Sequence, residues 1–163
     1  MVIEIQRARI DIKAVVSSVR RDDAGAIVVF LGSVRSDPEV QALDYEVYKP
    51  MALRTLTELV ERAKEKFGAL EMSIVHRVGR VPVGGDSVVL ACAAAHRSEA
   101  FAACAWAMDE VKRIVPIWKT EAGPRTPRGR RRSSNVRRDV SAASRKNRGG
   151  AGTGSAPSHP FRG

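Results

Sequence analysis

The sequence of 163 residues lacks the motifs that several common functional classes need. It has two cysteines, Cys92 and Cys104, in apolar surroundings and without a partner motif, so we expect small buried side chains rather than a disulfide or a metal site. The patterns GxGxxG, GxxxxGK[ST], CxxC and HExxH are absent, which leaves dinucleotide, nucleoside-triphosphate and zinc-hydrolase functions without a motif. Aromatic residues make up only 5% of the chain, so the stacking platforms of single-strand nucleic-acid readers are missing as well.

Long apolar runs are also missing. No stretch of about 18 apolar residues exists, so we expect no membrane-spanning helix. The first residues do not show the basic-then-apolar pattern of a signal peptide, and we therefore expect a cytoplasmic protein. The length suits one domain with a core of its own.

Acidic residues are almost absent from the C-terminal quarter. Residues 124–163 contain 11 of the 28 Lys and Arg residues but one acid, Asp139, whereas residues 1–123 carry no net charge. Large apolar side chains are equally scarce there, so this segment cannot offset its own ordering entropy. We expect a folded domain at 1–123 and a disordered Arg/Ser/Gly-rich tail at 124–163. Such a tail can bind nucleic acid or anionic surfaces, or it can be a solvated extension without a function, which we favour.

Hydrophobic periodicity predicts an α+β fold, with a mixed or antiparallel sheet and helices packed on one side. Asp11 is a candidate N-cap, Gly68 a candidate C-cap, and Pro116 ends the last helix because it lacks an N–H. We expect strands at 2–10 (at an edge), 26–35, 42–49, 69–79 and 87–95, a turn at 81–86, helices at 11–21, 50–67 and 97–115, and an extended segment at 116–119.

The last predicted helix connects two groups of cationic side chains. His96 and Arg97 precede it, where unpaired N–H groups of a first turn favour an anion. Lys112 falls on its apolar stripe, and Lys119 follows the proline. A lysine on an apolar helix face usually snorkels, so that its stem is buried and its ammonium group reaches solvent. The alternative is a pocket in which all four cationic side chains converge on an anionic or electrophilic group. The stripe itself has helical spacing and consists of Phe101, Ala105, Met108, Val111 and Val115.

Five segments carry a resemblance to a known family: GAIVVFLGSVR (25–35), ALDYEVYKPMA (42–52), IVHRVGRVPVGG (74–85), AHRSEAF (95–101) and DEVKRIVPIWKTE (109–121). In these segments the chain resembles the large, catalytic subunit of molybdopterin synthase. The resemblance implies an α/β hammerhead fold, a homodimer, and a heterotetramer with a small ubiquitin-like sulfur-carrier subunit ending in a Gly-Gly thiocarboxylate. It implies a sulfurtransferase of molybdenum cofactor biosynthesis that converts precursor Z, a cyclic pyranopterin monophosphate, into the molybdopterin dithiolene, with no metal or cofactor of its own.

The resemblance also implies roles for particular residues. Lys112 matches the lysine most closely tied to catalysis, and we expect it to be partly desolvated and to hold the thiocarboxylate or stabilise the intermediate. We expect Arg35 and Arg97 to anchor the phosphate and the pterin, and His96 to donate to the phosphate or to shuttle a proton. The other matching positions in the substrate site are Ser33, Val34, Lys119, Thr120 and Glu121.

Other interpretations of the same residues stay open. Arg35 can be an ordinary surface arginine, and His76 is best interpreted as a structural histidine. The chain departs from the family after Glu121, where the Arg-rich tail replaces an acidic segment containing Gly and Trp, as in a divergent paralogue, a truncated form or a frameshift product. Two other functions therefore remain: a non-catalytic relative that serves as a dimeric binding module, and a nucleic-acid binder that uses its tail, which the neutral body makes unlikely.

Overall fold

The computed structural model describes residues 1–122, so the expected tail at 124–163 lies outside the described residues. Ten elements follow one another along the chain. They are β1 (Ile3–Gln6), α1 (Ile12–Ser17), β2 (Ala26–Ser33), β3 (Ala42–Val47), α2 (Lys49–Phe67), β4 (Ala69–Arg77), β5 (Gly79–Pro82), β6 (Asp86–Ala94), α3 (Arg97–Ile114) and β7 (Ile117–Ala122).

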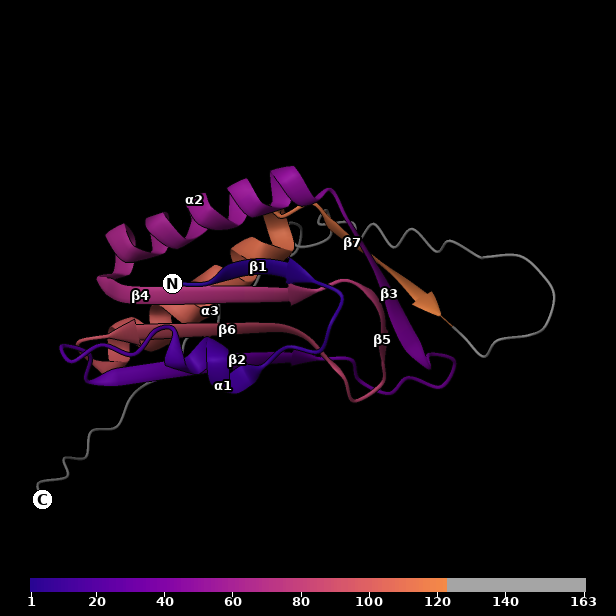
Figure 1. Cartoon of the computed structure of the whole chain (residues 1–163), viewed down its shortest axis with the longest axis horizontal. Helices are drawn as coiled ribbons and strands as arrows, with labels where there is room; N and C mark the ends of the chain where they lie inside the picture. Colours follow the sequence, from indigo (N-terminus) through magenta and orange to yellow (C-terminus); the bar gives the residue numbers. More distant parts are fainter. Residues whose placement is uncertain (123–163) are drawn as a thin grey trace, which may run out of the picture.

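A four-stranded mixed sheet forms the centre of the molecule (Figure 1). Its strand order is β1-β4-β6-β2, with β1 parallel to β4 and the other two pairs antiparallel. β1 therefore lies at an edge, as the sequence predicts. β6 runs through the middle, and eight of its nine residues are buried, because side chains cover it on both faces.

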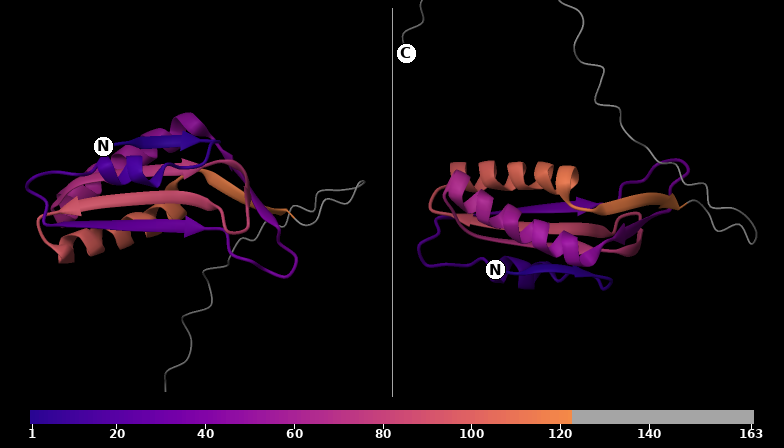
Figure 2. Two further views of the ribbon diagram at one scale, coloured as in Figure 1. Left: turned by 60° about the horizontal axis from the view of Figure 1, so that its bottom comes forward. Right: turned by 90° about the horizontal axis from the view of Figure 1, so that it is seen from above.

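The helices cover the two faces unequally. α2 and α3 lie side by side on one face (Figure 2), where Leu90 and Cys92 of β6 join the main core. The short α1 lies on the opposite face, where its Val15, and Val19 just after it, pack against Val89. The sequence places all helices on one side; the two long ones are there, and α1 is the exception. A six-residue helix is sufficient on the second face because the β6 residues beneath it are small.

A second, three-stranded antiparallel sheet lies beyond one end of the first (Figure 1). Its order is β5-β3-β7, so the last strand of the described chain pairs with β3 at its centre. The strand β5 was not predicted: the sequence indicates a strand that ends at residue 79 and a turn at 81–86. The four residues of β5 are too few to show a periodic hydrophobic pattern.

The helix ends predicted from Asp11, Gly68 and Pro116 are confirmed, whereas the first strand and the first helix are shorter than the predicted 2–10 and 11–21. Asp11 caps α1 by accepting a hydrogen bond from the Ala14 N–H at 3.1 Å. Gly68 ends α2 with φ 67°, a left-handed conformation that favours glycine. Val115, before Pro116, is extended and starts the turn from α3 into β7. No helix within residues 1–122 has the length and hydropathy to cross a membrane.

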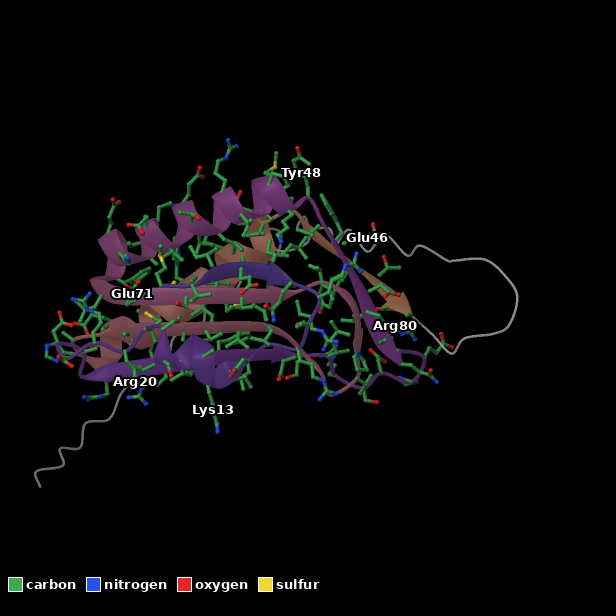
Figure 3. All side chains as sticks on the ribbon, viewed as in Figure 1. Lys13, Arg20, Glu46, Tyr48, Glu71 and Arg80 are labelled. Carbon is green, nitrogen blue, oxygen red and sulfur yellow. The ribbon has the colours of Figure 1, made fainter. Side chains whose placement is uncertain are left out.

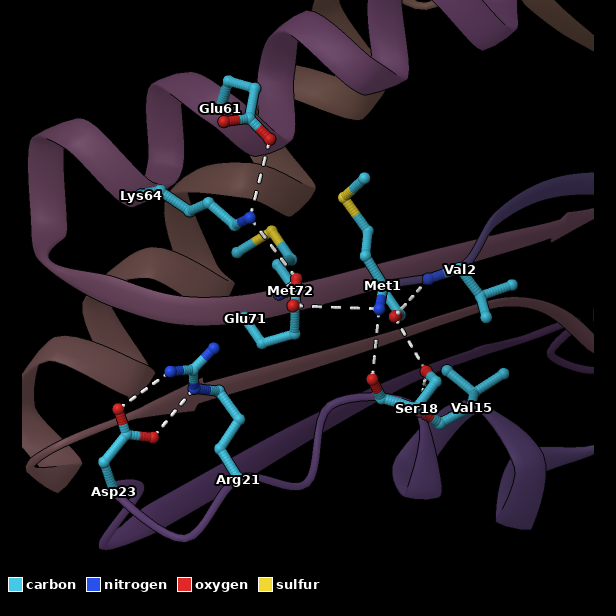
Figure 4. A network of polar contacts seen from close by, with 11 residues as sticks. Met1, Val2, Val15, Ser18, Arg21, Asp23, Glu61, Lys64, Glu71 and Met72 are labelled. Carbon is cyan, nitrogen blue, oxygen red and sulfur yellow. Dashed lines mark hydrogen bonds and ion pairs between the residues drawn. The ribbon is translucent and has the colours of Figure 1, made fainter.

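A polar network holds the N-terminal elements on β4 (Figure 4). The buried Ser73 hydroxyl accepts from the Val2 N–H at 2.7 Å and lies 2.8 Å from the Ser18 hydroxyl, which itself donates to the Val15 carbonyl. Glu71 adds ion pairs to the N-terminal amine at 3.8 Å and to Lys64 of α2 at 3.4 Å. β1, α1 and α2 are thereby tied to one strand.

Candidate functional site

Ser33, Val34 and Arg35 leave the end of β2 in a fixed conformation. The Ser33 hydroxyl donates to the Asp86 carboxylate at 2.6 Å. The Val34 N–H donates to Gly85 O at 3.0 Å, and Val34 O accepts from the Gly84 N–H at 2.8 Å. Val34 is buried and has no backbone polar group left for a ligand. Its contribution is to hold the neighbouring Arg35, whose side chain is exposed at this end of the sheet.

Lys112 lies in the last turn of α3, as predicted. Three of the five predicted stripe residues, Met108, Val111 and Val115, are buried, but the other two are not. Phe101 is 62% exposed, and Ala105 and Lys112 are exposed too, so the expected desolvation of Lys112 is not found in the single chain. The helix buries a neighbouring stripe of mostly small residues against the sheet: Ala100, Ala103, Cys104, Ala107, Met108 and Val111. Spacing alone did not distinguish these two adjacent stripes, because alanine fits either.

Lys119 lies in the middle of β7 and pairs with Tyr45 of β3 in the sheet register. Directly paired residues of antiparallel strands share a face, so Lys119 and Tyr45 are on the same face of the small sheet. Lys119 itself is exposed. Thr120 and Glu121 follow and pair with Asp44 and Leu43, so Glu121 shares the Lys119 face.

His76 is buried and makes an edge-to-face contact with Tyr45, at 5.4 Å between ring centroids. Its Nδ1 donates to the Arg77 carbonyl at 2.9 Å, since a carbonyl can only accept. Burial lowers the pKa of His76, partly opposed by that hydrogen bond. His76 is therefore neutral and satisfied, which agrees with its interpretation as a structural histidine.

His96 and Arg97 are exposed at the opposite end of α3 from the lysine, with His96 as the N-cap residue. Fifteen residues of helix at 1.5 Å each separate Arg97 from Lys112 by about 22 Å along the axis. The expected convergence of the four cationic side chains is therefore wrong for a single chain. Long side chains cannot close that gap.

Strand direction explains this division. β6 carries the chain from Asp86, beside Ser33, to Ala94, beside Ala26, and α3 then returns it to the starting end. One end of the molecule, which we call the lysine end, holds Ser33–Arg35, Lys112 and residues 119–121. The His-Arg end holds His96 and Arg97. Figure 3 shows Arg80 and Glu46 on the small sheet at the lysine end and Arg20 toward the His-Arg end.

The lysine end has cationic side chains without internal counter-ions. Among the ion pairs formed within residues 1–122, none involves Arg35, Lys112 or Lys119. By contrast, Arg113 of the same helix turn is held by Glu110 at 2.6 Å. Side chains of this kind are available to bind an anion.

Two features of the lysine end escaped sequence reasoning. Asp86 fixes Ser33, and Tyr45 pairs with Lys119 in the small sheet and contacts the His76 ring. The only signal for Asp86 is its place after the Gly84-Gly85 turn. A cavity of about 400 Å³ elsewhere contains none of the predicted site residues; its lining is Glu4, Ile5, Gln6, Arg7, Val47, Lys49 and Val78. No cluster of three or more potential metal-ligating side chains exists within the described chain.

Comparisons with known proteins identify the family of the chain. The MoaE protein family matches residues 5–114. The molybdopterin synthase catalytic subunit of Thermoplasma volcanium is 44% identical over 122 residues, which cover 73% of this chain and 89% of that protein.

Solved structures confirm the fold. Molybdopterin synthase from Staphylococcus aureus superposes with a TM-score of 0.71 at 34% identity, over 74% of this chain and 90% of that one. A chain from a Helicobacter pylori complex of subunits 1 and 2 of molybdopterin-converting factor has a TM-score of 0.70 at 21% identity, over 84% and 92%. The resemblance seen in the sequence is thus confirmed, and the chain belongs to the MoaE family of molybdopterin synthase catalytic subunits.

Proposed function

We propose that this chain is the catalytic subunit of a cytoplasmic molybdopterin synthase. It transfers sulfur from the thiocarboxylated C-terminus of a small carrier subunit to precursor Z and so forms the molybdopterin dithiolene. Family membership across residues 5–114 is the observation that carries this proposal. The domain at 1–123 is sufficient for the activity, and the segment at 124–163 is not required.

The charges at the lysine end suit this reaction. Both reactants are anions, since one carries a thiocarboxylate and the other a phosphate. Lys112 holds the thiocarboxylate and stabilises charge that develops as sulfur moves to the pterin side chain. Lys119, held in register on β7, positions that group with Thr120 and Glu121 beside it. Arg35, placed by the fixed Val34, binds the phosphate through its planar fork.

The chain supplies no sulfur nucleophile of its own. Burial raises the pKa of Cys92 to about 12 and that of Cys104 to about 11, so both remain thiols at neutral pH. The sulfur therefore has to arrive on a partner. A carrier subunit is consistent with the Helicobacter pylori relative, whose structure is a complex of two subunits of molybdopterin-converting factor.

His96 and Arg97 complete the site from a second copy of the chain. A single chain keeps them about 22 Å from Lys112 along α3, so they cannot contact the same substrate from there. In a homodimer related by a two-fold axis, the His-Arg end of one protomer can lie against the lysine end of the other. Each dimer then has two equivalent sites.

A sulfur-transfer assay tests the function directly. The purified chain is mixed with precursor Z and a carrier subunit bearing a C-terminal thiocarboxylate, and the dithiolene product is measured. The same carrier with an ordinary carboxylate is the control, because it presents the same surface without sulfur. We expect product only with the thiocarboxylate. If no product forms while the carrier still binds, the chain is a non-catalytic binding relative.

Mixed dimers test the shared site. Chains with Lys112→Ala and chains with Arg97→Ala should each be inactive alone. When they are unfolded, mixed and refolded together, half of the dimers combine the two chains, and one of their two sites is intact. About a quarter of the wild-type activity should return. A mixture that stays inactive contradicts a site shared between protomers.

A further inference from the structure

The three-stranded sheet is attached to the rest of the molecule by few contacts (Figure 1). Within residues 1–122, the strands β3, β5 and β7 run along one another, but none of them runs along a helix or along a strand of the large sheet. Lys119 belongs to this small sheet, whereas Lys112 belongs to α3, which packs on the large sheet. The position of one lysine relative to the other therefore depends on the few side chains that join the two sheets.

One face of the small sheet carries both its contacts with the core and Lys119. Val47 and Ile117 are directly paired, and the next pair on the same face is Tyr45 with Lys119. Val47, Ile117 and Tyr45 pack against the main core, and Lys119 is exposed. Tyr45 is therefore the core-packed residue directly opposite the lysine.

Tyr45 and His76 form an aromatic contact between the two sheets. Their ring planes are inclined by 70° at 5.4 Å between centroids, an edge-to-face geometry that aromatic pairs favour. The orientation of the His76 ring is fixed by the hydrogen bond from Nδ1 to the Arg77 carbonyl at 2.9 Å. The backbone of His76 is held as well, because β4 pairs with β1 on one side and with β6 on the other. His76 is thus a rigid support for the Tyr45 ring.

Within the small sheet, Lys119 is the one directly paired neighbour of Tyr45 that has a side chain. The partner on the other side is Gly79 of β5, whose φ of 78° favours glycine. A Cβ at Gly79 would lie 3.2 Å from a guanidinium nitrogen of Arg7. Directly paired residues have Cβ atoms about 4.5–5.5 Å apart, so the Tyr45 ring limits the directions in which the stem of Lys119 can extend.

We propose that Tyr45, supported by His76, is a positioning residue for Lys119. The two rings hold the small sheet on the large one, and the Tyr45 ring restricts the Lys119 side chain, so that its ammonium group keeps one place relative to Lys112. Neither ring has to touch the substrate. This inference rests on the proposed function for the role of Lys119, and it adds which residues set the geometry of that lysine.

Two substitutions of Tyr45 test whether its ring acts on the rate. Tyr45→Leu removes the ring and should lower kcat for sulfur transfer roughly ten- to a hundredfold, because a small misplacement of a reacting group has an effect of this size. Tyr45→Phe keeps the ring and should keep a rate close to that of the wild type. Val60→Ala, at a buried site in the second half of α2, is the control: it should lower the melting temperature and leave kcat unchanged. An unchanged kcat in Tyr45→Leu, or an equal loss in Tyr45→Phe, overturns the proposal.

A double-mutant cycle distinguishes positioning of Lys119 from a general structural role. Because Tyr45 acts through Lys119, Tyr45→Leu should cause no further loss of activity in a Lys119→Ala chain. A smaller fraction of folded enzyme would instead lower the activity of both backgrounds by the same factor, and that result overturns the proposal. His76→Leu removes the same contact from the large sheet and should give the same cycle, so the test does not depend on the Tyr45→Leu protein folding.

Nuclear magnetic resonance can observe the lysine without any substrate. Reductive methylation with ¹³C-formaldehyde labels the amines, and the sequence contains only seven lysines. The signals of Lys112 and Lys119 are assigned by their loss in Lys112→Ala and Lys119→Ala. In Tyr45→Leu the Lys119 signal should sharpen and move toward that of the unfolded chain, whereas the Lys112 signal should stay in place. A Lys119 signal that does not respond, or equal changes at both lysines, overturns the proposal.

These measurements separate this inference from the proposed function. If the Lys119 signal responds to Tyr45→Leu as expected but the wild type transfers no sulfur, the function is overturned and the control of Lys119 by Tyr45 stands. If the wild type is active but neither kcat nor the Lys119 signal responds to Tyr45→Leu, the positioning role is overturned and the function stands. If both proposals hold, Tyr45→Leu lowers the rate of sulfur transfer and releases the Lys119 side chain together.

Discussion

The two sheets of this protein differ in what their residues do. In β6 of the four-stranded sheet eight of nine residues are buried, whereas none of the six residues of β7 in the three-stranded sheet is buried. The large sheet therefore supplies the hydrophobic core, and the small sheet displays Lys119 at its surface. Substitutions in one should change stability, and substitutions in or beside the other should change activity. The following predictions test that separation.

The largest effect is expected at Lys112. Lys112→Ala should lower sulfur transfer about a hundred- to a thousandfold, or roughly 3 to 4 kcal/mol, because it removes a group that stabilises developing charge. Lys119→Ala should also lower the rate of sulfur transfer strongly, but less than Lys112→Ala does, because Lys119 mainly positions the reacting group. Lys112→Arg should not restore the rate, because a planar guanidinium differs in shape from an ammonium.

The melting temperature separates this result from unfolding. Lys112 is exposed in the single chain, so its truncation should leave the thermal unfolding of the protein nearly unchanged. Lys13→Ala on α1, another exposed lysine, is the matched control and should keep full activity. Near-normal turnover by Lys112→Ala would show that Lys112 is only a helix-end lysine.

Leu90→Ala tests the core sheet. Leu90 is fully buried at the centre of β6 and packs under α2 and α3. Its truncation leaves a cavity, and the free energy of unfolding measured in denaturant should fall by about 2 to 5 kcal/mol. Met51→Ala, at an exposed site on α2, should change it by less than about 0.5 kcal/mol. Equal effects of the two would contradict the assignment of the core to this sheet.

His76, which lies where the two sheets meet, should have a smaller effect on stability that depends on pH. Burial lowers its pKa below 6.5, so the unfolded chain binds a proton more readily than the folded one. The contribution of neutral His76 to the free energy of unfolding is complete above pH 6.5. It is lost as the pH falls through 6.5 toward the lower pKa of His76 in the folded chain. The melting temperature should therefore fall between pH 7.5 and pH 5.5, as calorimetry can measure. His76→Phe should flatten this slope, and His96→Gln, at an exposed site, should not.

Deletion of residues 124–163 should have the smallest effect. This segment has few large apolar residues with which to contribute to a core. The free energy of unfolding should change by less than about 0.5 kcal/mol, and sulfur transfer should be retained. A large loss of either would show that the segment forms part of the folded enzyme.

Local signals in the sequence predicted most of the fold. Asp11, Gly68 and Pro116 each act within one or two turns of chain, so the element ends they mark could be predicted without knowing the tertiary structure. The short β5 could not, because four residues give no usable period. α1 packs on the face of β6 that α2 and α3 do not cover. A local sequence pattern cannot predict this face, because it depends on where the other two helices pack.

The candidate site was predicted residue by residue but not in its arrangement. Motif similarity identified Arg35, Lys112 and Lys119, which the fold brings to one end. The same motifs gave no indication that His96 and Arg97 are at the other end, because that depends on the direction of β6 and α3. Helical spacing also placed Phe101 inside, although its side chain is 62% exposed on the single chain.

The burial of the two thiols has a consequence for the fidelity of sulfur delivery. With pKa values of about 12 and 11, Cys92 and Cys104 have on the order of one thiolate in ten thousand or fewer at neutral pH. Neither is therefore an effective nucleophile toward the carbonyl carbon of the carrier's C-terminal thiocarboxylate. Thiol-directed inhibitors and mild oxidants should spare the folded chain for the same reason. The two cysteines therefore do not compete with the carrier's sulfur as nucleophiles.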